Sequence, residues 1–411
     1  MFAFCAFLLE KTASFRYNIT EFIFVYKEEG VLKSLEEFSF LINGVASVTW
    51  QMVLMWIIGG LLMWLAIKKD FEPALLLPMG FGAILVNLPL TGVLGDSGIV
   101  QWLFQKGIAA SEAFPLLLFI GIGAMIDFGP LLSNPRMLLF GGAAQFGIFF
   151  TVCLAVLLGF PLKDAMATGV IGAADGPTSI LVSQVLKSSY MGAIAVAAYS
   201  YMALVPLIQP MAIRLVTTKH ERMIRMPYNP KSVSKTTKIL FPIIVTMIAG
   251  LISPDSIALV GFLMFGNLIR ECGKLENLSQ TAQGPLANLI TILLGITIAF
   301  QMRADAFVQP GTLIVMALGL VAFVFDTIGG VLFAKILNLF LPQDKKINPM
   351  VGGAGISAFP MSARVIQKMA LKEDNQNHIL MHAVGANVAG QIGSVVAGGI
   401  ILSLARSWGM M

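Results

Sequence analysis

The chain has 411 residues, of which 57% are hydrophobic and only 12% are charged. Soluble globular proteins are nearer to half apolar and a quarter charged, so this composition excludes a soluble enzyme, a disordered chain and a nucleic-acid-binding protein. The net charge of +5 therefore bears on orientation in a lipid bilayer rather than on binding to DNA. The three cysteines, Cys5, Cys153 and Cys272, are widely spaced and predict neither a disulfide framework nor a zinc site.

The first 48 residues differ from the rest of the chain. The apolar run 1–9 is too short to span a bilayer, and it lacks the basic start and the cleavage pattern of a signal peptide. Residues 18–42 mix apolar and charged side chains at helical spacing. We therefore predict that residues 1–48 form an N-terminal extension that lies partly at the membrane interface.

Apolar stretches almost free of charge follow in chain order. They occupy residues 49–67, 73–90, 113–128, 137–160, 190–213, 239–253, 256–268, 285–301, 306–341 and 379–405. A helix needs about 20 apolar residues to cross a bilayer, so several of these stretches must be paired or broken. Two more apolar stretches, 165–186 and 347–366, are rich in glycine and proline, and we predict that they are discontinuous or re-entrant.

The basic residues between these stretches predict the topology. The loop 214–238 carries seven Lys and Arg residues against the single acid Glu221, which places it in the cytoplasm by the positive-inside rule. Five crossings then precede this loop and five follow it, so the C-terminus is expected outside. We predict a first membrane repeat over 49–216, a cytoplasmic basic loop over 217–237 and a second repeat over 238–411.

The two halves also resemble each other in sequence pattern. Segment 117–142 matches 289–319, since each is an apolar run, a polar turn that ends in proline, and another apolar run. Segment 170–183 likewise matches 350–365. Five crossings per half make the repeats inverted, as in many secondary transporters. The predicted fold is an all-α polytopic membrane protein whose two broken segments meet near the midplane, and chance similarity among glycine-rich segments is the alternative.

Asp175 is the first candidate functional residue, because it is the only charged residue between Asp164 and Lys187. An isolated carboxylate at membrane depth is costly unless it is paired, protonated or bound to a cation. Gly176 and Pro177 interrupt the helix and free carbonyl oxygens, and Thr178 adds a hydroxyl group. These hard oxygen ligands suit Na⁺, although a polar packing contact is the alternative.

The second broken segment carries its own polar set, namely Asn348, Gly352, Ser357 and Arg364. A buried Arg364 would suit bidentate recognition of a carboxylate. It would otherwise pair with Asp175 or extend to the membrane interface.

Three more polar residues interrupt apolar helices. Tyr201 is expected to hydrogen-bond to the ion site or to carry a proton, unless it makes a plain contact between helices. Asn387 offers an amide oxygen. Asp326 is a second intramembrane acid, which either pairs with Lys335 at a distance or joins a second ion site.

Several long motifs together resemble one protein family. They are FIGIGAMIDFGPLLSNP, GAADGPTSILVS, AIAVAAYSYMALVPLIQP, LMFGNLIRECG, INPMVGGAGISAFPMSARV and HAVGANVAGQIGS. They resemble the β subunit of the sodium-pumping decarboxylases, which act on oxaloacetate, methylmalonyl-CoA or glutaconyl-CoA, and the resemblance covers about residues 50–405. The long N-terminus and small differences such as Ala173 and Phe359 depart from the family pattern.

The resemblance implies a function for the chain. In the family, a soluble α subunit transfers a carboxyl group to its biotin, and the β subunit decarboxylates carboxybiotin, takes up a proton and exports Na⁺. A small membrane γ subunit assists assembly, and the β subunits are expected to associate, as a trimer. The rival interpretation is a secondary Na⁺/carboxylate transporter without chemistry.

The resemblance also implies roles for individual residues. Asp175, Tyr201 and Arg364 are expected to be catalytic, and Arg364 and Ser357 to line the carboxybiotin pocket. The expected Na⁺ ligands are Asp175, Thr178, Asn348, Gly352, Ser357 and Asn387.

Overall fold

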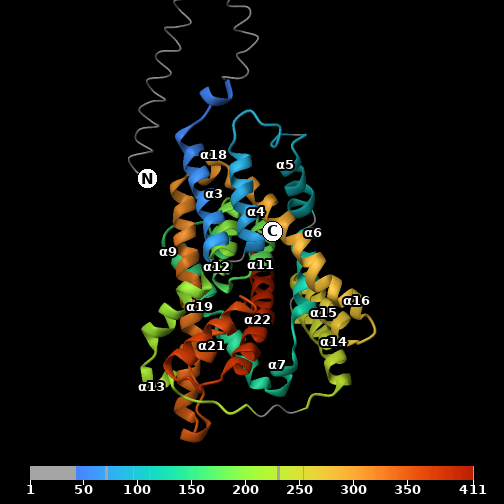
Figure 1. The fold of residues 1–411 in the computed structure, drawn as a ribbon, viewed down its shortest axis with the longest axis vertical. Helices are drawn as coiled ribbons and strands as arrows, with labels where there is room; N and C mark the ends of the chain where they lie inside the picture. The colour runs from blue at the N-terminus through green and yellow to red at the C-terminus, as the bar shows by residue number, and fades with distance from the viewer. Residues whose placement is uncertain are drawn as a thin grey trace, which may run out of the picture.

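The computed structural model describes residues 43–69, 73–95, 97–110, 112–228, 232–252 and 254–410. All regular secondary structure within these ranges is helical, so the prediction of an all-α protein is confirmed (Figure 1). Most of the predicted N-terminal extension, residues 1–42, lies outside the described residues, and so does part of the basic loop, residues 229–231.

Helices α3 to α12 make up most of the first half of the chain. They are α3 (Trp50–Lys69), α4 (Pro73–Val86), α5 (Ile99–Phe104), α6 (Ala113–Met125), α7 (Gly129–Ser133), α8 (Leu138–Ala143), α9 (Phe146–Leu157), α10 (Leu162–Gly169), α11 (Gly176–Val185) and α12 (Met191–Val216). A short 3₁₀ helix, η3 (Val170–Ala173), lies between α10 and α11.

The second half begins at the basic loop. Its helices are α13 (Lys219–Arg222), α14 (Lys235–Ile252), α15 (Ile257–Glu271), α16 (Glu276–Thr281), α17 (Ala287–Ile298), α18 (Ala304–Phe307), α19 (Pro310–Phe340), α20 (Met350–Gly353), α21 (Met361–Glu373) and α22 (Leu380–Ser407).

Several of these helices are suited to cross a membrane. Among the described residues, five are long and apolar enough, namely Trp50–Lys68, Pro135–Leu157, Glu276–Met302, Pro310–Phe340 and Leu380–Ser407. The number rises to seven if each of two bent pairs forms one span. The chain is therefore a polytopic membrane protein, whereas ten crossings in two inverted repeats stay a prediction.

A bend in α12 has a local cause. Its two parts, Met191–Met202 and Leu204–Val216, meet at 75°. Pro206 lies just after this bend and has no N–H to donate to the carbonyl of Met202, four residues earlier. The bend therefore follows from the sequence.

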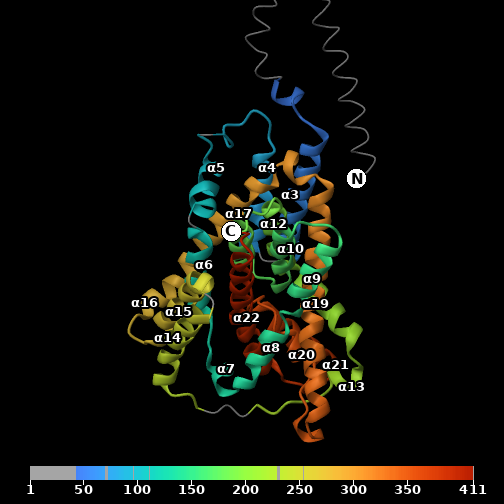
Figure 2. The same ribbon diagram turned by 180° about the vertical axis from the view of Figure 1, so that it is seen from behind.

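Small residues let the helices approach closely. A side chain on Gly123 of α6 would overlap the carbonyl of Leu263 in α15, and one on Gly266 of α15 would overlap the carbonyl of Ile120. Lipid tails are as apolar as the side chains of a helix, so the hydrophobic effect does not drive helices together in a bilayer. Close van der Waals contacts of this kind drive their association instead. Figures 1 and 2 show the result, in which α14, α15 and α16 pack with α6 beside the central helix α22.

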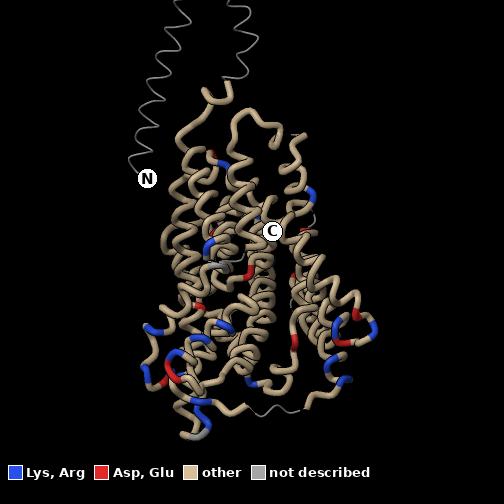
Figure 3. The backbone as a smooth tube through the Cα atoms, viewed as in Figure 1, with Lys and Arg blue, Asp and Glu red and all other residues tan. Residues whose placement is uncertain are grey.

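Many of the Lys, Arg, Asp and Glu residues gather toward the end of the molecule that holds α13 and α21 (Figure 3). There, Arg222 pairs with Glu373 at 2.9 Å and Arg225 pairs with Asp374 at 2.6 Å. We call these four residues the charged end. They tie the start of the basic loop to α21.

Candidate functional site

The first broken segment runs from α10 through η3 to α11. Its helical path stops at Ala174, which has a left-handed φ of +52°, and Asp175 is extended. Asp175 is the N-cap of α11, and Pro177 follows in the first turn, where a helix does not need its N–H. Residues 165–186 are therefore discontinuous, as the glycine and proline content predicts.

The second broken segment contains a comparable interruption. Helix α20 ends at Gly353, and α21 begins at Met361. The two interruptions touch, because the amide of Ser357 donates to the carbonyl of Ala173 at 2.9 Å. The two broken segments thus meet, whereas their position near the membrane midplane stays a prediction.

Side chains from both segments converge on the Asp175 carboxylate. Its Oδ2 accepts hydrogen bonds from the hydroxyls of Thr178 at 2.7 Å, Ser394 at 2.8 Å and Ser357 at 3.4 Å. The Ser394 hydroxyl also lies 3.1 Å from that of Ser357. We call Asp175, Thr178, Ser357 and Ser394 the Asp175 cluster.

Helix α22 supplies a row of polar groups along one face. Asn387, Gln391 and Ser394 are spaced by four and three residues, so they share that face. The Asn387 amide donates to the carbonyl of Ile356 at 2.7 Å, and the Gln391 amide donates to that of Ser357. The sequence interpretation recognised Asn387 but missed Gln391 and Ser394, although their helical spacing was a usable signal.

The Asp175 cluster is buried and holds no basic residue. Asp175 is only 4% exposed, and the ion pairs found among the described residues do not involve it. Hydroxyl donors are neutral, so they leave the negative charge of an ionised Asp175 uncompensated. Carboxylate and hydroxyl oxygens are the ligands that hard cations such as Na⁺ prefer.

Two unpaired oxygens lie on elements next to the cluster. Asn387 Oδ1 and the Tyr199 hydroxyl are buried without a hydrogen-bond partner among the described residues. The Tyr199 ring lies against Gly176, where an added Cβ would overlap it. Tyr199, which the sequence interpretation did not single out as a site residue, therefore lies beside the Asp175 segment.

Tyr201 points to another helix. Its hydroxyl donates to the carbonyl of Met316 in α19 at 2.5 Å. Arg364 is exposed on α21, so the expectation of a buried guanidinium is wrong. The sequence suggested burial because Arg364 is the only charged residue in a long apolar stretch. In the structure it lies on the exposed face of α21.

Asn348 and Gly352 lie before the interruption and make other contacts. The Asn348 amide donates to the carbonyls of Arg222 at 2.8 Å and Ile224 at 2.9 Å, and thus holds the start of the basic loop. Gly352 packs on Gly330 of α19, where a side chain would overlap backbone. Their described contacts do not include the Asp175 cluster.

Comparison with known proteins shows the family of this chain. Residues 51–405 match the family model described as the Na⁺-transporting oxaloacetate decarboxylase beta subunit. The chain belongs to this family. It is similar to the glutaconyl-CoA decarboxylase subunit beta of Acidaminococcus fermentans, with 48% identity over 88% of this chain and 95% of the relative.

Two further relatives have different substrates in their names. The oxaloacetate decarboxylase beta chain of Klebsiella pneumoniae is 44% identical over 85% of this chain and 94% of its own length. The methylmalonyl-CoA decarboxylase subunit beta of Propionigenium modestum is 46% identical over 86% and 94%. The chain is thus a β subunit of the Na⁺-transporting decarboxylases, a component of a complex with several subunits.

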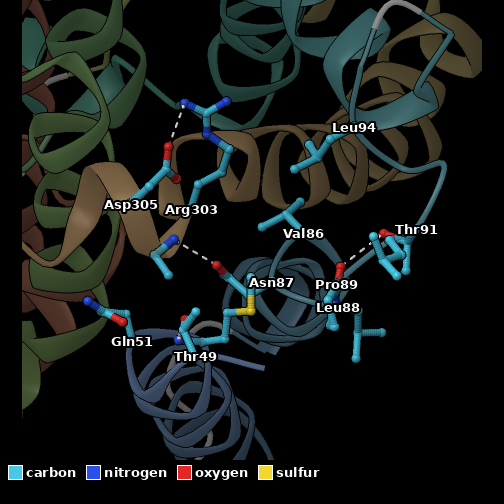
Figure 4. Close-up of a pocket in the computed structure, with 13 residues that line it drawn as sticks. Thr49, Gln51, Val86, Asn87, Leu88, Pro89, Thr91, Leu94, Arg303 and Asp305 are labelled. Atoms are coloured by element: carbon cyan, nitrogen blue, oxygen red, sulfur yellow. Dashed lines mark hydrogen bonds and ion pairs between the residues drawn. The ribbon is translucent and has the colours of Figure 1, made fainter. Parts of the chain in front are cut away.

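A cavity elsewhere in this β subunit is separate from the Asp175 cluster. It measures about 520 Å³ and lies between the start of α3, the end of α4 and α18 (Figure 4). Asn87 joins these elements, since its side chain accepts from the amide of Ala304 at 2.7 Å and donates to the carbonyl of Met302 at 2.8 Å. Arg303 and Asp305 form an ion pair at its edge. None of the lining residues belongs to the cluster.

Proposed function

We propose that this β subunit decarboxylates carboxybiotin, consumes a proton and moves Na⁺ across the membrane by alternating access. The biotin is carried by a soluble α subunit that holds the carboxyltransferase, and a small membrane γ subunit completes the complex. The relatives are β subunits of oxaloacetate, methylmalonyl-CoA and glutaconyl-CoA decarboxylases, so the family supports this class of reaction.

The observation that carries the proposal is the buried Asp175 carboxylate at the contact between two broken helical segments. Its three side-chain donors are neutral hydroxyls, which can turn their lone pairs toward a cation. Na⁺ would neutralise the charge that these hydroxyls leave uncompensated. Asn387 supplies a further unpaired oxygen. Asn348 and Gly352 contribute through the fold of the second segment, since Asn348 holds the start of the basic loop and Gly352 packs on Gly330.

The chemical step needs an anion site and a proton. Carboxybiotin carries a carboxylate on a ring nitrogen, and Arg364 and Ser357 are proposed to bind it. The bond between that nitrogen and the carboxyl carbon breaks, its electron pair stays on nitrogen and takes up a proton, and CO₂ leaves. Tyr201 is proposed to carry the proton. Because Arg364 is exposed, it is accessible to a ligand presented by another subunit.

The coupling step uses the interruptions themselves. Residues 49–216 and 238–411 are proposed to be inverted repeats around the cytoplasmic loop 217–237, with the C-terminus outside. Movement of one broken segment against the other would separate Ser357 from Ala173 and open the Asp175 cluster to one face. Association of β subunits as a trimer would hold the surrounding helices still.

The test uses the complete complex in proteoliposomes. Release of CO₂ from the carboxylated biotin carrier is followed with and without Na⁺, together with Na⁺ transport. We expect Na⁺-dependent release in the native complex and its loss in Asp175→Asn, which keeps the shape of the side chain and removes its charge. The control is Asp305→Asn, at an ion pair near the cavity of Figure 4.

Undiminished Na⁺-dependent decarboxylation in Asp175→Asn would overturn the role of this residue. Uptake of a carboxylate driven by Na⁺, with no decarboxylation in the native complex, would establish the transporter alternative.

A further inference from the structure

A second acid lies deep in the described structure, apart from the Asp175 cluster. Asp326 belongs to α19 and is fully buried. Its Oδ1 accepts the amide of Ile148 at 3.1 Å, at the start of α9. The carboxyl group therefore occupies the N-terminal end of a helix, which favours negative charge but supplies only about half a positive charge.

The other oxygen of this carboxyl group has no partner. Asp326 Oδ2 is buried and makes no hydrogen bond in the described structure. It faces Gly172 of η3, where an added Cβ would lie 2.5 Å from Oδ2 and 2.8 Å from the Cβ of Ala322. The backbone of the first broken segment thus closes over Oδ2.

This closure favours a proton over Na⁺ at the carboxyl group. Na⁺ needs several oxygen ligands around it, whereas Oδ2 has no hydrogen-bond partner among the described residues, and the space between Oδ2, Gly172 and the Ala322 methyl group is too small even for a Cβ atom. A proton needs no such space. A neutral, protonated carboxyl group also avoids an unpaired charge in the membrane interior.

Among the described residues, no basic side chain compensates the charge, contrary to the pairing with Lys335 considered from the sequence. Lys335 instead lies 3.1 Å from Glu221 and 3.0 Å from the carbonyl of Val216. In the described part of the chain, the hydrogen bond to the Asp326 carboxyl group comes from a backbone amide, that of Ile148. The other ionisable groups on elements packed against α19 are directed elsewhere or lie at helix ends. Asp164 of α10 bonds to Ser188, Tyr201 of α12 bonds to Met316, and Tyr199 of α12 packs against Gly176. Lys163 and Arg214 lie at the ends of α10 and α12, and Cys153 of α9 is exposed.

We propose that Asp326 is a proton-carrying carboxyl group, protonated while Gly172 covers it and exchanging its proton when the first broken segment moves. This role rests on the proposed function, because it assigns part of the proton uptake to a group distinct from the Na⁺ site. Gly172 is three residues from Asp175, and the carbonyl of Ala173 accepts from Ser357. One movement of η3 therefore affects both acids.

The first test is infrared difference spectroscopy of the complete complex in membranes, recorded between Na⁺-free and Na⁺-loaded states. We expect a carbonyl stretch of a protonated carboxyl group that shifts in ²H₂O and disappears in Asp326→Asn. The matched control, Asp305→Asn, should keep the band. This spectroscopic result does not depend on turnover.

The second test is coupled turnover. Asparagine keeps an oxygen that accepts from the Ile148 amide, and its shape resembles that of the neutral acid. If Asp326 only stabilised the start of α9, Asp326→Asn would therefore keep its function. We expect Asp326→Asn to lower Na⁺-coupled decarboxylation roughly 100-fold, the scale of a lost proton-transfer group. Asp326→Glu should restore part of it.

Full turnover in Asp326→Asn, or an unchanged infrared band, would overturn the proposal. If one bound Na⁺ removed the protonated-carboxyl band of each Asp326, Asp326 would be a ligand of the sodium ion. This result would also overturn the proposal. If the native complex showed the Asp326 band but no Na⁺-dependent decarboxylation, the proposed function would fail while the protonated state of Asp326 stood. If Asp326→Asn did not fold, assignment of the native band by ¹³C-labelled aspartate and Asp326→Glu would decide.

Discussion

The Asp175 cluster and the charged end hold their acids in opposite ways. At the charged end, Glu373 and Asp374 each face an arginine at 2.9 and 2.6 Å. In the cluster, Asp175 faces three neutral hydroxyls, and among the described residues no basic side chain pairs with it. An acid with an arginine partner has its charge satisfied within the protein, whereas Asp175 requires a proton or a cation from outside. The contrast separates structural pairing from a site built to exchange an ion.

The largest expected effect falls on the cluster. Ser394→Ala removes the hydroxyl that bonds to both Asp175 and Ser357. A hydrogen bond to a charged group is worth about 1.5–3 kcal/mol, so the Na⁺ concentration for half-maximal decarboxylation should rise roughly 10- to 100-fold. The measurement is CO₂ release against Na⁺ concentration. Ser407→Ala, on the same helix but exposed, is the control, and equal responses of the two variants would remove Ser394 from the site.

The charged end should respond in stability and not in Na⁺ affinity. Arg222→Gln leaves Glu373 without its cation and removes the bond to the carbonyl of Thr217. We expect a loss of about 1–3 kcal/mol in the free energy of unfolding, measured by thermal or denaturant unfolding in detergent. A shift in Na⁺ dependence comparable to that of Ser394→Ala would break the distinction between the two regions.

Tyr199 tests the boundary of the cluster. Its buried hydroxyl has no partner among the described residues, and its ring covers Gly176. If this oxygen completes the cation site, Tyr199→Phe should raise the half-maximal Na⁺ concentration by roughly fivefold, about 1 kcal/mol. Tyr190→Phe, at the start of α12, serves as the control. Unchanged Na⁺ dependence in Tyr199→Phe would confine the site to the hydroxyls and the carboxylate.

The smallest effect concerns pH and the second pair of the charged end. The Arg225 guanidinium donates to both oxygens of Asp374 and holds the pKa of that carboxyl below its ordinary value of about 4. A lowered pKa in the folded state gives stability that is complete above the ordinary value and is lost as the pH falls through the lowered one. Thermal unfolding midpoints should therefore fall on acidification by slightly more in the native protein than in Asp374→Asn. Identical pH profiles would show that the pair contributes nothing, as many exposed pairs do.

Much of the candidate site was predictable because its signals are local. Glycine and proline in 165–186 and 347–366 interrupt helices by their own backbone properties, and the structure has interruptions in both places. Asp175 was predictable because a single acid in a long apolar stretch is costly and conspicuous. Ser394 was harder to predict, because serines are common and small and only its helical spacing from Asn387 and Gln391 set it apart from Ser403 or Ser407.

Composition and local chemistry thus determined an all-helical membrane protein with two broken segments and a buried acid. The tertiary structure alone decided which side chains meet at that acid, because the rotation of α22 and the contact between the interruptions depend on packing across long stretches of chain. It brought Ser394 and Tyr199 to the first segment, turned Tyr201 toward α19 and left Arg364 exposed. It also paired Lys335 with Glu221 and left Asp326 without a cation among the described residues. The physical reason is that the neighbouring helices, and not the residues of a helix alone, determine which of its faces is buried.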